Sequence, residues 1–140
     1  MRVLLIYPNI IETPKDISMG IACISAMLKE KGHTVSLIDT TWGMSDTEIM
    51  QQVNEFKPEF VCTSMATNEF KYATHIVDMI RRTYPSIPVI AGGYHPTMAP
   101  QEVLEQKNFE MVCVGEGDVA IAEVADMLSK GEKRTDILNI

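Results

Sequence analysis

The sequence predicts a single α/β domain in which helices cover both faces of a parallel sheet. Short apolar runs of strand length alternate with longer amphipathic segments along the whole chain. The 140 residues are 46% hydrophobic, which is enough for one full core. Parallel neighbours need a right-handed crossover long enough to hold a helix, and the intervening segments have that length. We therefore expect a doubly wound, three-layer sandwich.

Five apolar runs are the candidate strands. They cover residues 3–6, 35–38, 60–62, 89–91 and 111–114. The commonest order for five such strands is 2-1-3-4-5, which places the topological switch between the first and third strands. Ligands of these sheets bind near the switch, at the carboxyl ends of the strands.

The segments between the strands have the helical period. Their apolar faces consist of Ile17, Ile21, Ile24 and Leu28, then Ile49, Val53 and Phe56, then Ala73, Ile76, Val77 and Ile80, and finally Ile121, Val124, Ala125 and Leu128. Ser45 and Glu48 form a capping box, Gly32 stops the first helix and Pro85 closes the third. A shorter helix is expected to start near Pro100.

Charge and cysteine spacing exclude several classes of function. The net charge of -7 and a pI of about 4.9 argue against a nucleic-acid partner. No apolar stretch approaches the roughly 20 residues that span a bilayer, and the start lacks a signal-peptide cleavage region, so we expect a cytoplasmic protein without a membrane partner. Cys23, Cys62 and Cys113 are too scattered for a zinc or iron–sulfur signature, and we expect them to be reduced and buried.

Two loops at the carboxyl ends of the strands offer polar candidates. Tyr7, Pro8 and Asn9 follow the first strand, and the long segment through Pro14 is either an ordinary surface loop or a cover for a bulky ligand. Ser64, Met65, Ala66 and Thr67 follow the third strand. A polar ligand tail could enter there, but capping of the next helix by Ser64, Thr67 or Asn68 is favoured.

Two further loops contain paired glycines. Gly92, Gly93, Tyr94, His95 and Pro96 follow the fourth strand, and Gly115, Glu116 and Gly117 follow the fifth, with Asp118 expected to cap the last helix. Glycines lack a Cβ atom and let a flat ligand approach the backbone closely. Tight turns need glycine too, so either pair alone is a weak signal. Together these loops predict a broad cleft for a large, flat, mostly uncharged group.

Histidine and tryptophan supply the remaining candidates. His33 is expected at the amino ends of the strands, and His75 falls inside the third helix. His95 alone is expected at the carboxyl ends, where bracing of the loop or hydrogen bonding to a ligand is favoured over metal ligation. Trp42 could cover a ligand or pack on the first helix, and packing is favoured. We therefore predict no residue of this chain as a metal ligand.

These motifs resemble the N-terminal cobalamin-binding domain of radical S-adenosylmethionine enzymes, of the magnesium-protoporphyrin IX monomethyl ester cyclase and cobalamin-dependent methylase type. The resemblance covers essentially the whole chain and agrees with a flavodoxin-like, Rossmann-like fold. Its motifs are Val-Leu-Leu-Ile-Tyr-Pro-Asn at the start, Met19-Gly20-Ile21-Ala22, Lys31-Gly32-His33, Gly92-Gly93-Tyr94-His95-Pro96-Thr97 and Val114-Gly115-Glu116-Gly117-Asp118.

The resemblance implies that a corrin lies over the carboxyl ends of the strands, while its nucleotide tail inserts beside Ser64 and Gly92-Gly93. Better-known corrinoid proteins carry Asp-x-His-x-x-Gly after the first strand, and that histidine ligates cobalt from below. Here the loop reads Tyr-Pro-Asn-Ile-Ile-Glu, so we expect cobalamin without a lower-face protein histidine. Removing a lower donor should ease reduction of the cobalt.

The same resemblance suggests that the catalytic part of the enzyme lies elsewhere. The sequence has no Cys-x-x-x-Cys-x-x-Cys, so the 4Fe-4S cluster and S-adenosylmethionine belong to a radical S-adenosylmethionine domain absent from this chain. We expect residues 1–130 to be the cobalamin-binding domain and residues 131–140 to be a tail leading to the absent domain. The isolated chain is expected to be inactive, and the parent enzyme to be a methyltransferase or cyclase.

Three alternatives share this fold. A receiver-like signalling domain needs clustered acids after the first strand, where Tyr7 and Pro8 stand, and a lysine after the fifth. A flavodoxin-like electron carrier needs a first loop rich in Ser, Thr and Gly around the flavin phosphate, and this loop contains Pro8, Ile10, Ile11 and Glu12. The third alternative, a domain that only docks a partner, is not excluded by the sequence.

Overall fold

The computed structural model describes residues 1–10 and 18–140, so Ile11, Glu12, Pro14 and Ile17 lie outside the described residues. Five parallel strands form one sheet in the order β2-β1-β3-β4-β5. They are β1 (Arg2–Tyr7), β2 (Thr34–Asp39), β3 (Phe60–Ser64), β4 (Val89–Gly92) and β5 (Met111–Val112). The predicted α/β class and strand order are confirmed.

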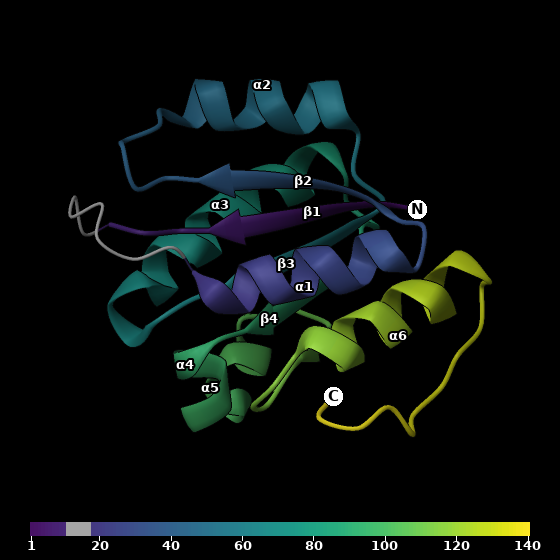
Figure 1. The fold of residues 1–140 in the computed structure, drawn as a ribbon. Helices are drawn as coiled ribbons and strands as arrows, with labels where there is room; N and C mark the ends of the chain where they lie inside the picture. The colour runs from purple at the N-terminus through teal and green to yellow at the C-terminus, as the bar shows by residue number, and fades with distance from the viewer. Residues whose placement is uncertain (11–17) are drawn as a thin grey trace.

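The helices form the two outer layers (Figure 1). They are α1 (Met19–Glu30), α2 (Asp46–Phe56), α3 (Phe70–Thr83), α4 (Tyr94–Met98), α5 (Pro100–Glu105) and α6 (Asp118–Ser129), with a 3₁₀ turn, η1 (Thr67–Glu69), before α3. The helices α1 and α6 pack together on one face of the sheet, and α2 and α3 pack on the other.

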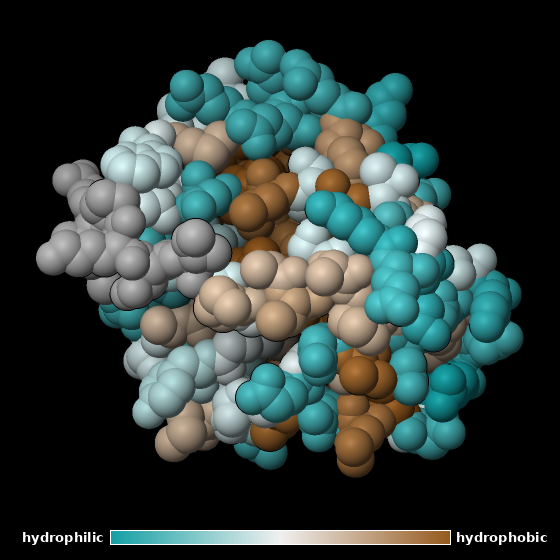
Figure 2. All heavy atoms as spheres, viewed as in Figure 1, coloured by the Kyte–Doolittle hydropathy of each residue, from teal (hydrophilic) through white to brown (hydrophobic). Residues whose placement is uncertain are grey.

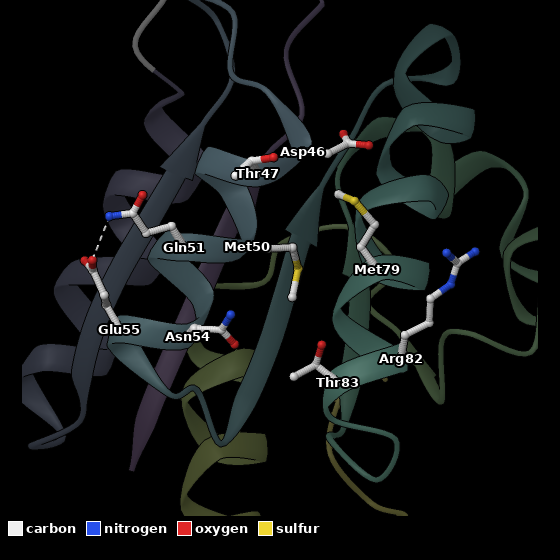
Figure 3. A pocket seen from close by; sticks show the side chains of 9 residues that line it. All are labelled: Asp46, Thr47, Met50, Gln51, Asn54, Glu55, Met79, Arg82 and Thr83. Carbon is white, nitrogen blue, oxygen red and sulfur yellow. Dashed lines mark hydrogen bonds between the residues drawn. The ribbon is translucent and has the colours of Figure 1, made fainter.

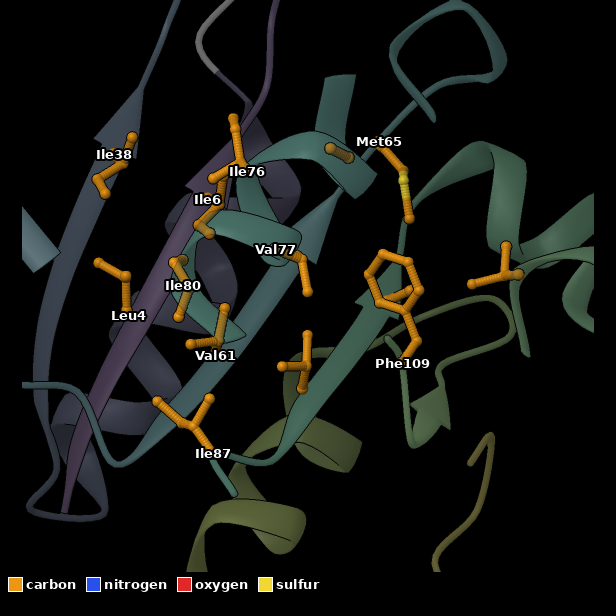
Figure 4. Close-up of a cluster of buried hydrophobic side chains, with 14 of the residues drawn as sticks. Leu4, Ile6, Ile38, Val61, Met65, Ile76, Val77, Ile80, Ile87 and Phe109 are labelled. Carbon is orange, nitrogen blue, oxygen red and sulfur yellow. The ribbon is translucent and has the colours of Figure 1, made fainter. Parts of the chain in front are cut away.

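Each face of the sheet has its own apolar cluster because successive strand residues point to opposite sides. On the α3 side, Leu4 and Val61 pack against Ile80 (Figure 4). On the α1 and α6 side, Phe60 packs with Leu28. The central strands are apolar on both faces, as a parallel sheet covered by helices requires.

Most predicted helix ends are confirmed. Ser45 Oγ accepts a hydrogen bond from the Glu48 amide, while the Glu48 carboxylate accepts one from the Ser45 amide, which completes the capping box. Gly32, just past the end of α1, has a positive φ of 82°. Helix α3 ends at Thr83, immediately before Tyr84 and Pro85.

Three local expectations were wrong. The segment from Tyr94 was expected to be a loop but forms α4, because Pro96 falls in the first helical turn, where its missing N–H is tolerated. Ser64, Thr67 and Asn68 do not cap the next helix, because the chain forms the turn η1 before α3 begins. The Glu69 carboxylate instead accepts a hydrogen bond from the Ala66 amide. Asp118 is the first residue of α6 rather than its cap, and it accepts a bond from the Val119 amide.

The last ten residues return to the domain. Residues 131–136 are exposed, as expected, but Ile137 is buried in the cluster under α6. The Val114 amide then donates to the Asn139 carbonyl over 2.8 Å. The end of the described chain therefore lies beside the carboxyl end of β5.

The loops after β3 and β4 touch each other through their backbones. The Met65 amide donates to the Gly92 carbonyl over 3.0 Å, and the His95 amide donates to the Met65 carbonyl over 3.1 Å. Gly93 lies between them with a φ of 94°, and a Cβ atom there would be 2.7 Å from the Met65 nitrogen and 2.9 Å from its oxygen. Only glycine fits this contact.

We predict that Gly93→Ala lowers the free energy of unfolding by roughly 3 kcal/mol or more, because backbone strain and overpacking add. Gly43→Ala is the matched control, since Gly43 also has a positive φ, of 76°, but open space around it. The control should cost only about 1–2 kcal/mol, the strain alone. Urea unfolding of both variants measures the difference, and equal costs would contradict the tight contact.

Candidate functional site

A cleft of about 110 Å³ opens at the carboxyl edge of the sheet between α1 and α6. Its apolar lining comes from Leu5, Ile6, Ile21, Ile24, Cys62, Cys113 and Ile121, and the rest from Gly20, Thr63, Ser64, Gly92, Gly93, Gly115, Glu116 and Gly117. The structure thus brings together predicted site residues from the loops after β3, β4 and β5. The cleft lies beside the carboxyl ends of β1 and β3, the paired neighbours at which the strand order reverses.

Gly117 lines the cleft close to side chains of α1 and α6. A Cβ atom on it would meet Cys113 Sγ at 3.3 Å, Ile121 at 3.4 Å and Ile24 at 3.6 Å. Its φ of -111° is one that any residue adopts. Glycine therefore serves here to leave space and not to permit an unusual backbone conformation.

The predicted residues after β1 do not line this cleft. Asn9 is buried, its Nδ2 donates to Thr41 Oγ1 over 2.9 Å, and its carbonyl accepts from Thr40 Oγ1 over 2.9 Å. Pro8 is also buried. These contacts tie the loop after β1 to the loop after β2.

Tyr7 lines a separate hollow of about 310 Å³ over β1 and β2, beside α1. Figure 2 shows its apolar floor, to which Leu5 and Leu37 contribute. Trp42 lies at its margin and is 75% exposed, so the expectation that it packs on α1 was wrong. The edge strand β2 is incompletely covered on this face, which leaves the hollow open.

The remaining candidates are divided between core and surface. Met65 is buried in the cluster on the α3 side, whereas Thr67 is exposed and Ala66 half-buried. Tyr94 is exposed, and Pro96 is buried. None of these five lines the cleft.

None of the three histidines lines the cleft. His95 is buried with its ring 4.4 Å from that of Phe70, on the α3 side of the sheet. His33 lies at the amino ends of the strands between the N-terminal amine and Asp126, and His75 pairs with Asp46 on the surface. The described residues contain no cluster of His, Cys, Asp or Glu able to hold a metal ion.

Two cysteines line the cleft as neutral thiols. Burial, with a smaller contribution from nearby Cys113, raises the pKa of Cys62 well above its ordinary value. Burial, together with the charges of Asp118 and Glu116, raises the pKa of Cys113 to about 11. Cys23 on α1 is exposed, so the expectation that all three cysteines are buried was wrong for this one; all three are free thiols.

A larger and more open hollow of about 810 Å³ lies between α2 and α3 (Figure 3). Met50 and Met79 contribute apolar surface to it, and polar groups such as Asp46, Asn54 and Arg82 surround them. It contains no predicted site residue and lies on the helical face opposite α1 and α6. The smaller cleft at the sheet edge is therefore the candidate site.

Sequence reasoning missed two polar side chains at this edge. Thr97 Oγ1 donates to the Gly93 carbonyl and accepts from the Gly115 amide, and Asn139 Nδ2 donates to the Glu116 carbonyl. Thr97 stood within a recognised motif but was given no role, and no sequence signal marked Asn139.

The sheet order and the cleft at the topological switch place the chain among flavodoxin-like α/β domains. Its sequence matches the family described as B12 binding domain over residues 15–125. The chain therefore belongs to the B12-binding domain family.

Sequence relatives include an uncharacterized methyltransferase of Pyrococcus horikoshii, which is 25% identical over 148 residues, covering 100% of this chain and 32% of the relative. The anaerobic magnesium-protoporphyrin IX monomethyl ester cyclase of Synechocystis is 24% identical, covering 76% of this chain and 22% of the relative. The chain spans about a third or less of the length of these relatives.

Two solved structures share the fold across 99% of this chain. The radical S-adenosylmethionine methyltransferase TsrM of Kitasatospora setae matches with a TM-score of 0.88 and 22% identity, over 28% of its own length. The cobalamin-dependent S-adenosylmethionine radical enzyme OxsB matches with a TM-score of 0.85 and 23% identity, over 20% of its length. No helix among the described residues is long and apolar enough to cross a membrane.

We predict that only one of the three thiols reacts rapidly with a thiol reagent at pH 8 in the folded protein. Cys23 is exposed, whereas the raised pKa values keep Cys62 and Cys113 protonated, and a thiol reacts through its thiolate. Ellman titration of the native chain and of Cys23→Ser tests this. The variant should react only on unfolding, and a fast thiol in native Cys23→Ser would contradict the prediction.

Proposed function

We propose that this domain binds cobalamin, with the corrin over the carboxyl ends of the strands, the nucleotide tail in the cleft, and no histidine of this chain below the cobalt. The glycine-lined cleft at the topological switch is the observation that carries the proposal. It occurs in a chain of the B12-binding domain family, and Ser64, Gly92 and Gly93 lie on its wall.

The cleft residues fit a flat group with a polar end. Leu5, Ile21 and Ile121 offer an apolar lining, and Gly117 leaves space that a side chain would fill. The Ser64 hydroxyl stands on the wall as a hydrogen-bonding group. The residues of this chain would thus hold the tail between α1 and α6 and exclude water from its faces.

The positions of the histidines support a lower face without a protein ligand. The ring of His95 is buried against that of Phe70, and both His33 and His75 pair with acidic side chains away from the cleft. The cleft thiols are protonated at neutral pH and are poor ligands, because a metal binds the thiolate. Bound cobalamin would supply a cobalt centre able to carry a methyl group or electrons.

We also propose that the domain serves a larger methyltransferase or cyclase whose radical S-adenosylmethionine domain holds the 4Fe-4S cluster. The names of the sequence relatives and their greater length support a methyltransferase or cyclase, and the TsrM structure with a bound 4Fe-4S cluster supports the radical S-adenosylmethionine domain. Residues 1–130 would be the cofactor domain, and residues 131–140, which pack back on it through Ile137 and Asn139, would connect it to the catalytic part.

Exposed apolar side chains at the carboxyl edge of the sheet support such a partner. Most large apolar side chains exposed on the described residues lie near the carboxyl ends of the strands: Ile10, Met19, Trp42, Tyr94, Met98, Val114, Val119, Leu138 and Ile140. An exposed apolar concentration of this kind marks a binding surface. The corrin and the downstream domain of the same protein would cover it.

We predict that the purified chain binds hydroxocobalamin and cobalt(II) cobalamin, detected by absorbance titration. Electron paramagnetic resonance of the bound cobalt(II) form should lack the splitting from a lower nitrogen ligand. Nitrogen splitting that His95→Ala abolishes would overturn the histidine-free assignment. Absence of corrinoid binding, or preferential binding of a flavin in a parallel titration, would overturn the proposed function.

We further predict that Gly117→Val weakens cobalamin binding by at least about tenfold, because the added side chain fills the cleft next to Ile24. Ala26→Val is the matched control, since Ala26 is exposed on α1 and does not line the cleft. The control should bind within about twofold of the unaltered chain. Equal affinities for both variants would mean that the ligand does not enter this cleft.

A further inference from the structure

The loop after β5 has little apolar packing to hold it. Val114, Gly115 and Glu116 are exposed, and a Cβ atom on Gly115 would touch nothing within 4 Å. Gly115 also has a φ of 85°, a conformation that few other residues adopt. Segments with few buried contacts open at a low free-energy cost. The shape of this loop must therefore depend on hydrogen bonds.

One hydroxyl connects this loop to the loop after β4. Thr97 Oγ1 donates to the Gly93 carbonyl over 2.8 Å and accepts from the Gly115 amide over 3.0 Å. Both glycines line the cleft and both have a positive φ. Thr97 therefore fixes two cleft-lining backbones relative to each other while lying outside the cleft itself.

Asn139 holds the same loop from its other side. Its Nδ2 donates to the Glu116 carbonyl over 3.0 Å, and its own carbonyl accepts from the Val114 amide over 2.8 Å. Asn139 has a φ of 71°, which asparagine tolerates better than most residues. Burial of Ile137 under α6 anchors the segment that carries Asn139.

We infer that Thr97 and Asn139 are positioning residues, which hold the loop of residues 114–117 in its ligand-receiving shape before the ligand arrives. This inference rests on the proposed cobalamin site. A loop ordered in advance loses less conformational entropy on binding, so the free protein binds more tightly than one whose loop is mobile. Neither residue touches the ligand in this role.

Thr97→Val and Thr97→Ser test the first contact. Valine has nearly the shape of threonine but loses both hydrogen bonds, whereas serine retains the hydroxyl. We expect Thr97→Val to bind cobalamin roughly 3- to 10-fold more weakly than the unaltered chain, and Thr97→Ser to bind within about twofold of it. Thermal unfolding of each variant checks that the fold is retained.

Asn139→Asp tests the second contact, because aspartate keeps the shape and the tolerance of positive φ but cannot donate at neutral pH. Asn54→Asp is its matched control: Asn54 is exposed on α2, lines the hollow of Figure 3 and gains the same charge far from the cleft. We expect roughly 3- to 10-fold weaker cobalamin binding for Asn139→Asp and no more than a twofold change for Asn54→Asp.

Hydrogen exchange in the ligand-free protein provides a readout independent of the cofactor. Amides 114–117 should exchange faster in Thr97→Val and Asn139→Asp than in Thr97→Ser, Asn54→Asp or the unaltered chain. If the unaltered chain binds cobalamin and the two test variants bind it equally well, the inference is overturned. Unchanged exchange in the two variants overturns it as well. Failure of the unaltered chain to bind would instead overturn the proposed function, while exchange would still report whether the two side chains hold the loop.

Discussion

The close approach of Gly93 to the backbone of Met65 is the contact on which the carboxyl edge of the sheet depends. It forces the loop after β4 to follow the loop after β3, because the Met65 amide and carbonyl are both used in bonds to that neighbouring segment. The Thr97 hydroxyl then links this segment to the loop after β5, because it donates to the Gly93 carbonyl and accepts from the Gly115 amide. Three neighbouring strands thus present their loops as one connected backbone surface around the cleft.

The two faces of the sheet have different consequences for the site. On the α3 side, the edge is sealed by Met65, Phe70 and the buried ring of His95. On the α1 and α6 side, small residues leave the cleft open between the helices. The alternation of side chains along each strand therefore separates a closed supporting face from an open face suited to a ligand.

The large elements could be predicted from sequence because their signals are local and repeated. Five apolar runs and the helical periods between them predicted the strands and their alternation with helices, and the commonest order for five such strands was confirmed. Ser45 with Glu48 predicted the correct start of α2. Helix α4 was missed because Pro96 usually marks a loop, although it is tolerated in a first turn. The exposure of Cys23 was missed because its residue type is usually buried.

The candidate site was only partly predictable, because some of its contacts join residues that are far apart in the sequence. Glycines on two neighbouring loops together indicated a cleft, and the structure shows close approach at Gly93 and Gly117 but open space at Gly115. Asn9 was expected at the site as well, yet it bonds to Thr40 and Thr41 from the loop after β2. Side-chain bonds such as that of Asn139 to Glu116 join residues far apart in the chain and leave no pattern in the sequence.

The return of the last residues to β5 also makes the two margins of the sheet unequal. At the β5 margin the strand is only two residues long, Met111–Val112, and the Val114 amide just beyond it is paired with Asn139. At the opposite margin β2 has β1 on one side and, among residues 1–10 and 18–140, no further strand on the other, while Leu37 and Trp42 are exposed. Unpaired strand backbone is a template for another chain. Aggregation by strand addition would therefore start at β2, and a lysine introduced on that strand's exposed face is the natural way to keep concentrated samples monodisperse.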